Sequence, residues 1–288
     1  MTTLVDIFDE HLPAVKAFLE QRPETSLFLL SNIRAFGPRR GQSLYSGNFK
    51  ALFENGNVAA VFCLARNGGL VVQAAGRTDV AGAIVEAALS EALPIRGVLG
   101  EWETSSAVWM TLRAANLITE TLASKEVLYR LDVARSGDAV DTSLAVRRLT
   151  PDDHDAWDSL SVAFQKEIGV PNMGDREQRK ASFTRSAGLG HWWGGFEGTR
   201  LVSMTAIIAL HERLAQIGAV FTVPDRRRCG FSRAVMQHVI RDSRLVHDLE
   251  RLFLFTGETN AAARHLYESL GFDSFSYFGL FFGEPVQE

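Results

Sequence analysis

The sequence is poor in cysteine and contains no long hydrophobic run. Its two cysteines, Cys63 and Cys229, lie far apart and have neither the spacing of a metal site nor that of a disulfide framework, which predicts two reduced thiols and no metal. No apolar run approaches the roughly 20 residues that a membrane-spanning helix needs. The first residues, MTTLVDIFDEHLPAV, are acidic and lack the hydrophobic region of a signal peptide. These absences predict a soluble, cytoplasmic protein with no membrane partner.

An excess of positive charge is also lacking. The 30 Lys and Arg residues against 34 Asp and Glu give a formal net charge of −4, so any anion-binding site must be local. The 46% of hydrophobic and 22% of charged residues are ordinary for a globular protein with a proper core. A chain of 288 residues suits two domains of ordinary size.

A domain boundary is expected at VARSGDAVDTS (133–143), which is polar and has no apolar period. We therefore predict an N-terminal domain over residues 1–135, a linker over 136–143 and a C-terminal domain over 144–288. In the C-terminal part, hairpins are followed by strands that alternate with helices, which predicts an α/β class with a mixed sheet. This domain is expected to open with a short strand and a first helix, in LAVRRLTPDDHDAW, with Thr150 as its cap and Trp157, Leu160, Phe164 and Ile168 on one face. The expected strands after it are 191–198, 201–210, 214–223, 251–257 and 275–282, and the further expected helices are 231–245 and 260–271.

The first half repeats the second in outline. FENGNVAAVFCLA at Phe53 has the shape of FEGTRLVSMTAIIA at Phe196, an offset of 143 residues. ETSSAVWMTLRAANL at Glu103 matches ETNAAARHLYESLGF at Glu258, an offset of 155 residues. About a dozen extra residues therefore lie between these landmarks in the second copy. Two unrelated α/β domains are the alternative.

Those extra residues include a basic loop, in FTVPDRRRCGFSRAVM (221–236). A helix that starts near Gly230 presents unpaired backbone N–H groups to the preceding strand, and glycine lets an anion approach the backbone closely. Pro224 ends strand pairing just before the loop. Arg226, Arg227 and Arg228 add positive charge. The loop therefore predicts a phosphate site, with a solvated basic turn as the alternative.

VPDRRRCGFS resembles the acyl-CoA pyrophosphate signature of the GCN5-related N-acetyltransferase (GNAT) superfamily, Gln/Arg-x-x-Gly-x-Gly/Ala. It reads Arg227 to Ser232 here, with Ser232 in place of the usual last Gly or Ala. NAAARHLYESLGF (260–272) resembles the family's Asn-x-x-Ala-x-x-x-Tyr-x-x-x-Gly-Phe motif. The resemblance covers residues 144–288 well and the first half only in outline. The arrangement is similar to tandem acetyltransferases whose N-terminal copy is degenerate.

The resemblance implies two tandem GNAT-like domains, each a mixed, mostly antiparallel sheet flanked by helices. It implies transfer of an acetyl group from acetyl-CoA to an amine of a small molecule or peptide by direct attack, without a metal. Tyr267 is the implied general acid, and packing on a helix stripe is its alternative role. The first copy has Leu112 at the aligned position, which cannot donate a proton. The implied cofactor-binding residues are Phe221, Thr222, Val223, Arg227, Arg228, Cys229, Gly230, Phe231, Ser232, Arg233, Asn260 and Tyr267.

No general base can be assigned. Many family members carry a glutamate on the strand before the loop, where this chain has Gln216 and no carboxylate. His211 and Glu212 in the preceding turn, Glu258 after the next strand, and water are all alternatives. On the acceptor side, one of Trp192 and Trp193 would line a pocket while the other packs, since they alternate faces of a strand. Glu167, near the end of the first helix of the C-terminal domain, would hold an amine or be exposed.

Other functions stay open. The missing carboxylate also fits a catalytically silent CoA-binding module. A nucleic-acid contact is disfavoured because the basic residues neither spread over a face nor interleave with aromatic ones. Transfer of larger acyl groups, as in two-domain glycine N-acyltransferases, is a neighbouring activity. The sequence leaves the acceptor and the choice between monomer and homodimer undetermined.

Overall fold

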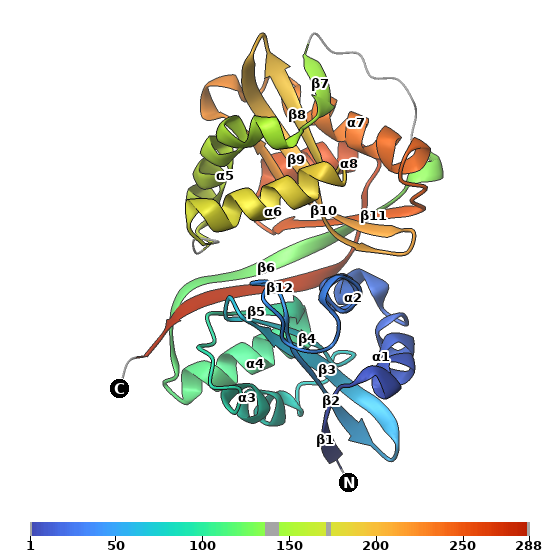
Figure 1. Ribbon diagram of the computed structural model, residues 1–288, viewed down its shortest axis with the longest axis vertical. Coiled ribbons are helices and arrows are strands. Elements are labelled where there is room, and N and C mark those ends of the chain that lie inside the picture. Colours follow the sequence, from blue (N-terminus) through green and yellow to red (C-terminus); the bar gives the residue numbers. More distant parts are fainter. Residues whose placement is uncertain (1, 136–143, 171–173, 287–288) are drawn as a thin grey trace. The chain divides into compact units, whose positions relative to one another are not determined.

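The computed structural model describes residues 2–135, 144–170 and 174–286 (Figure 1). The predicted linker, residues 136–143, lies outside the described residues. The chain forms two compact units. Unit 1 consists of Met1–Leu128, Gly257–Thr259 and Ser276–Glu288, and unit 2 consists of Tyr129–Thr256 and Asn260–Phe275. The units are therefore not two consecutive halves of the sequence.

Unit 1 has a mixed sheet in the order β1-β2-β3-β4-β5-β12-β6. The pair β4 and β5 is parallel, whereas the pairs β1–β2, β2–β3 and β3–β4 are antiparallel. The strands that start in this unit are β1 (Thr2–Asp6), β2 (Gly47–Glu54), β3 (Asn57–Ala65), β4 (Gly69–Gln73), β5 (Gly97–Glu101) and β6 (Ile118–Asp132). The helices are η1 (Asp9–His11), α1 (Leu12–Leu19), α2 (Pro23–Phe36), α3 (Ala81–Leu89) and α4 (Trp102–Ala114).

Unit 2 has the order β6-β11-β10-β9-β8-β7, in which β10 and β11 are parallel. Its strands are β7 (Ala145–Arg148), β8 (Trp192–Glu197), β9 (Arg200–His211), β10 (Leu214–Thr222), β11 (Arg251–Gly257) and the start of β12 (Asp273–Pro285). Its helices are η2 (Val133–Arg135), η3 (Pro151–Asp153), α5 (His154–Ile168), α6 (Arg176–Gly188), η4 (Pro224–Arg226), α7 (Phe231–Leu245) and α8 (Ala261–Ser269). Within the described residues, none of the helices is both long and apolar enough to cross a membrane.

The predicted internal repeat is confirmed at the level of elements. Each copy runs strand, two helices, three strands, helix, strand, helix, strand. The last strand of each copy is exchanged: β12 pairs in antiparallel fashion with β5 of unit 1, and the end of β6 belongs to unit 2. Figure 1 shows the exchanged β12 beside β5. The predicted fold class, an α/β mixed and mostly antiparallel sheet flanked by helices, is confirmed.

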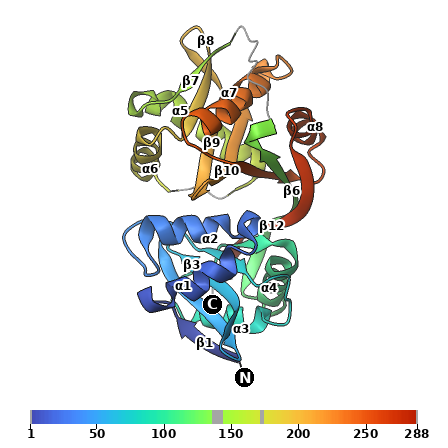
Figure 2. The same cartoon turned by 90° about the vertical axis from the view of Figure 1, so that its right-hand side faces the viewer.

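Helices cover both faces of each sheet, because alternate strand residues are apolar on both sides. In unit 1, Val61 and Cys63 pack with α1 and α2, whereas Phe62 and Leu64 pack with α3 and α4. Figure 2 shows these four helices beside the sheet of unit 1. In unit 2, Met204 and Ala206 of β9 belong to the core with α5 and α6. The intervening Thr205 faces α7, where its Oγ1 lies 3.8 Å from the sulfur of Met236.

Two histidines of unit 2 predict how its stability depends on pH. The ring centroids of His191 and His247 lie 5.9 Å apart. Burial, aided by the positive charges of His247 and Arg148, lowers the pKa of His191 from 6.5 to about 4. Burial and Arg148 also lower the pKa of His247. The unfolded chain takes up these protons near pH 6.5 and the folded chain does not, so stability is full above that pH and falls as the pH is lowered toward 4.

We therefore expect the urea midpoint to be lower at pH ~5 than at pH ~7.5, since the unfolded state binds more protons in this window. The variant His191→Asn should show a smaller difference between the two midpoints. Equal midpoints in the unmodified protein would contradict the expectation.

Candidate functional site

The parallel strands β10 and β11 separate after three residue pairs. Their pairing runs from Leu214 with Arg251 to Gln216 with Phe253, whereas β10 stays paired with β9 as far as Thr222. A bulge shifts the register between Gly218 and Phe221. Residues 217–222 of β10, the open edge, therefore have no β11 partner among the described strands. The carbonyl of Thr222 accepts from Arg227, and the backbone groups on this edge that neither β9 nor a side chain engages are available to an extended ligand.

The loop after β10 takes a conformation suited to anions. Arg228 has φ +62° and Gly230 has φ +77°. Left-handed residues beside right-handed ones turn successive N–H groups toward one point, which makes an anion-binding concavity. A Cβ atom built on Gly230 would meet no other atom within 4 Å, so the space in front of the loop is open. Arg228, unlike Gly230, has a Cβ and is strained by about 1–2 kcal/mol in this conformation.

Helix α7 begins at this loop without a side-chain cap. Gly230 is its N-cap residue, and among the described residues no side-chain hydrogen bond caps its first turn. The first helical hydrogen bond runs from the N–H of Ala234 to the carbonyl of Gly230, at 3.0 Å. The N–H groups of Phe231, Ser232 and Arg233 precede it. A helix start with free donors and a positive dipole end is a site for a phosphate.

The three predicted arginines have different roles. Arg226 pairs with Glu197 at 2.7 Å in the hairpin between β8 and β9. Arg227 donates to the carbonyl of Thr222 at 3.0 Å and pairs with Glu167 at 2.6 Å. Arg226 and Arg227 therefore hold the loop in place, and a carboxylate compensates the charge of each. Arg228 is exposed and has no ion-pair partner in the part of the chain that the structure describes. It supplies the uncompensated charge.

The serine that departs from the family signature ties the strand to the helix. Ser232 and Thr222 share a hydrogen bond of 2.7 Å between their hydroxyls, and Thr222 shares another of 2.9 Å with Ser203. The Gly or Ala usual at the position of Ser232 has no hydroxyl for this bond. Sequence reasoning missed Ser203, since no motif marks a serine on the neighbouring strand. Of the other loop residues, Cys229 is exposed, and Arg233 donates to the Ser269 hydroxyl at 2.6 Å.

Helix α8 carries the other two predicted residues. Asn260 caps it, since the side-chain oxygen accepts from the N–H of Ala263 at 3.2 Å. Tyr267 is 5% exposed, and its ring packs edge-on against Tyr129 at 5.9 Å and against Phe272 at 6.2 Å. Packing thus accounts for the ring of Tyr267. The role of its hydroxyl as an acid stays a prediction.

The corresponding loop of unit 1 is closed by its own chain. Glu101, at the end of β5, accepts hydrogen bonds from the N–H groups of Ala74 at 3.0 Å and Gly76 at 2.6 Å. Thr104 donates to the same oxygen at 2.8 Å. Ala75, with φ +56°, and Gly76, with φ +79°, give this loop left-handed residues like those of unit 2. The loop of unit 1 thus binds a carboxylate through the N–H groups of Ala74 and Gly76, whereas the start of α3, like that of α7, has no side-chain cap among the described residues. Sequence reasoning did not identify Glu101.

The other candidates are placed as follows. His211 is 8% exposed and ends β9, so it is not a solvated turn residue. Glu212 and Glu258 are exposed. Trp192 and Trp193 do face opposite sides of β8, but both are buried. Trp192 donates to Ser186 at 2.9 Å and Trp193 to Asp242 at 2.9 Å. Glu167 is bound to Arg227, as described above, rather than solvated alone.

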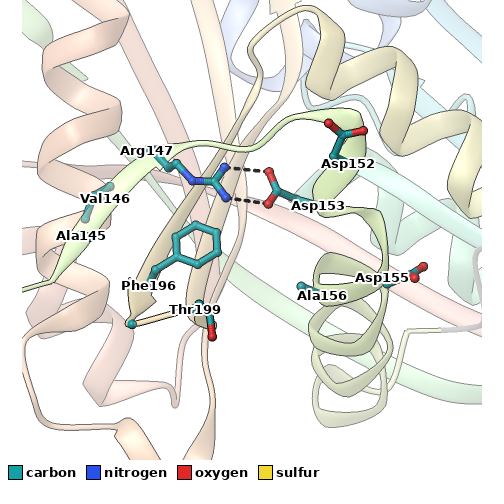
Figure 3. A pocket seen from close by; sticks show the side chains of 10 residues that line it. Ala145, Val146, Arg147, Asp152, Asp153, Asp155, Ala156, Phe196 and Thr199 are labelled. Carbon is teal, nitrogen blue, oxygen red and sulfur yellow. Dashed lines mark hydrogen bonds and ion pairs between the residues drawn. The ribbon is translucent and has the colours of Figure 1, made fainter.

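A pocket of about 560 Å³ lies elsewhere in unit 2, between β7, η3 and the β8–β9 hairpin. Figure 3 shows Arg147 and Asp153 pointing toward each other, with the ring of Phe196 beside the guanidinium. Their bidentate pair has distances of 2.6 and 2.7 Å. Asp155 is engaged by Arg176 at 2.9 Å. The carboxylates of this pocket are thus largely compensated, and the chemistry points to the α7 loop instead.

Comparison with known proteins relates the C-terminal part of the chain to one family. Residues 154–272 match the model of the acetyltransferase (GNAT) family. A comparison with curated proteins found no match. Among solved structures, a GCN5-related N-acetyltransferase from Sphaerobacter thermophilus is similar, with a TM-score of 0.67 and 14% identity over 98% of this chain and 95% of that chain.

Two more structures extend the similarity. A GCN5-related N-acetyltransferase from Kribbella flavida has a TM-score of 0.57 and 12% identity over 91% of this chain and 94% of that one. A tandem GNAT protein from the clavulanic acid biosynthesis pathway has a TM-score of 0.56 and 12% identity over 100% of both chains. At these identities the similarity concerns the fold, and it agrees with two GNAT-like units in one chain.

Proposed function

We propose, from the match of residues 154–272 to the model of the acetyltransferase (GNAT) family, that unit 2 transfers an acetyl group from acetyl-CoA to an amine acceptor. The acceptor would be a small molecule or a peptide. Larger acyl groups would use the same phosphate site, because the loop contacts only the far end of the donor. The activity would belong to unit 2 alone.

In this proposal the pyrophosphate of the donor binds the N–H groups of Arg228 to Ser232, with the Arg228 guanidinium beside it. The pantetheine arm lies along the open edge of β10. The backbone groups of Phe221 and Val223 that were expected to bind it are engaged within the protein, since the Phe221 carbonyl accepts from the Ser203 hydroxyl at 3.1 Å and the Val223 N–H donates to Val202 at 3.0 Å. The negative phosphate at the start of α7 is favoured by the free donors and by the helix dipole. Asn260, at the start of α8, would contact the donor in addition to capping its helix.

The chemistry would be direct attack. The neutral nitrogen of the acceptor forms a bond to the thioester carbonyl carbon, and the carbon–sulfur bond then breaks. The departing thiolate takes a proton from the Tyr267 phenol, whose free pKa is near ~10. The proton lost by the amine returns to the phenol through water. No carboxylate base is required by this scheme, in keeping with Gln216 on β10.

The observation that supports the proposal most is the contrast between the two loops. In unit 1 the amides of Ala74 and Gly76 hold the carboxylate of Glu101. In unit 2 no side chain of the described residues caps the start of α7. The loop of unit 1 thus gives an example of an anion held by this kind of turn, which supports a ligand anion at the α7 loop.

We expect acetyl-CoA to raise the melting temperature, since a ligand that binds only the folded state stabilises it by about 2.7 kcal/mol at 100 times Kd. For a unit of this size, that corresponds to several degrees, at about 2–4 °C per kcal/mol. Residues 224–236 should also gain protection from hydrogen exchange. If saturating acetyl-CoA and CoA change neither quantity, the proposal is wrong.

A catalytically silent CoA-binding module is the second candidate, favoured by the missing carboxylate on β10. It shares the binding result above and differs in turnover. A broad panel of amines, monitored by release of free thiol, separates the two. Thiol release above the hydrolysis rate with any amine supports the transferase. Binding without such release from the whole panel supports the silent module.

A further inference from the structure

Gln216 is a buried amide whose side-chain nitrogen has no hydrogen-bonding partner among the described residues. Gln216 is 2% exposed, and its side-chain nitrogen makes no hydrogen bond within the described parts of the chain. Buried amides are normally satisfied, because an unpaired donor loses its bonds to water and gains none. A native exception of this kind points to a group that is supplied by a ligand.

Unit 1 offers an internal comparison. Gln73 lies on β4, the strand that corresponds to β10, and it is fully buried. Its side-chain nitrogen donates to Thr25 at 2.6 Å and to Ser26 at 3.2 Å. Its oxygen accepts from the N–H of Ala75 at 2.8 Å. The same residue type is therefore satisfied in the copy whose loop is closed and unsatisfied in the copy whose loop is open.

The position of Gln216 is at the end of the proposed site that is remote from the phosphate loop. It belongs to the last residue pair before β10 and β11 separate. Six residues, or about 20 Å of extended strand, separate it from Thr222. An extended donor anchored by its phosphates at Gly230 would carry its reactive end toward this point.

Gln216 lies on the side of the sheet where we expect the acceptor to bind. Gln216 and Gly218 share a face, since strand residues alternate. Gly218 pairs with Ala206, which packs in the core cluster with Trp157 of α5 and Phe221. Helix α7 covers the opposite face. Gln216 therefore belongs to the α5 side of β10, away from the helix that would hold the phosphates.

We propose that the Gln216 amide donates a hydrogen bond to a carbonyl or carboxylate oxygen that lies beside the reacting amine of the acceptor. This inference rests on the proposed transferase function and narrows its substrates to amino acids or the N-terminal residues of peptides. A neutral amide does not remove a proton from an ammonium group, so Gln216 is a specificity residue and not a base. An acceptor that lacks the oxygen would leave the buried donor unpaired.

The kinetic test compares the unmodified protein with Gln216→Leu, using alanine, alaninamide and isopropylamine within the amine panel. The oxygen-bearing acceptors should lose roughly 10-fold in kcat/KM in the variant, while isopropylamine is unchanged. A preference for alaninamide over alanine would indicate a peptide, and the reverse would indicate a free amino acid. If the panel turns over but Gln216→Leu affects all amines equally or none, the inference fails and the transferase function stands. If no amine turns over, both fail.

Stability of the ligand-free protein gives a second measurement. Gln216→Leu should raise the melting temperature, because it removes an unpaired buried donor. The matched control Gln73→Leu should lower the melting temperature, because the buried Thr25 and Ser26 hydroxyls lose the hydrogen bonds that Gln73 donates to them. A loss of stability in Gln216→Leu equal to that of the control would show that the Gln216 amide serves the fold, and would overturn the inference.

Discussion

Gly230→Glu is expected to weaken acetyl-CoA binding by more than ~100-fold, a loss of over about 2.7 kcal/mol. A glutamate at this position places a carboxylate where the pyrophosphate would bind, and like charges repel across the same donors. The new side chain would also fill the space in front of the loop, which is open in the structure. The backbone contributes a separate cost, because φ at Gly230 is +77°.

Gly76→Glu is the matched control. Gly76 has φ +79°, and a Cβ atom built on it also meets no other atom within 4 Å. Its substitution therefore carries the same backbone strain, about 1–2 kcal/mol, without touching the loop of unit 2. We expect it to leave acetyl-CoA affinity unchanged. Affinity is measured by titration calorimetry, with far-UV circular dichroism to show that both variants fold.

The two possible deviations have distinct meanings. Unchanged affinity for acetyl-CoA in Gly230→Glu would show that acetyl-CoA does not bind at the α7 loop. Equal losses in Gly230→Glu and Gly76→Glu would show that unit 1 also binds the cofactor, against the observation that Glu101 occupies its amides.

The loop and the helix behind it could be predicted because their signals are local. The predicted helix over 231–245 and strand over 251–257 coincide with α7 and β11. Gly230 adopts a left-handed conformation as the cap of α7, which is the backbone role that glycine commonly fills at such a junction. The internal repeat could also be predicted, since its apolar strands keep the same order in both copies.

Features that depend on distant contacts could not be predicted. Three adjacent arginines look equivalent in sequence, but Glu197 and Glu167 compensate Arg226 and Arg227 and leave Arg228 alone. These glutamates lie about 30 and 60 residues away in the chain, and no spacing rule links them to the loop. The role of Glu101 could not be predicted for the same reason, because a carboxylate at a strand end binds the loop amides only once the fold is complete. The exchange of β6 and β12 also leaves no local signal.

Tyr267→Phe is expected to lower turnover by about 10²–10⁴-fold while acetyl-CoA affinity is retained. The ring of Tyr267 packs against Tyr129 and Phe272, and phenylalanine keeps these contacts because only the hydroxyl is lost. A proton donor acts as the thiolate departs and contributes nothing to the binding of the intact thioester. The loss should therefore appear in kcat and in kcat/KM equally, with the melting-temperature shift by acetyl-CoA unchanged.

Tyr129→Phe is the matched control, since this neighbouring hydroxyl is held by the protein itself. It donates to Glu268 at 2.9 Å and accepts from Arg264 at 3.1 Å. Its removal should reduce stability by about 0.5–1.5 kcal/mol, because the partly exposed Arg264 and the exposed Glu268 each lose a hydrogen bond, and should leave turnover close to that of the unmodified protein. The turnover of both variants is measured as the rate of free-thiol release with the best acceptor of the amine panel. If Tyr267→Phe turns over at the unmodified rate, Tyr267 is a packing residue and the leaving thiolate must take its proton from water.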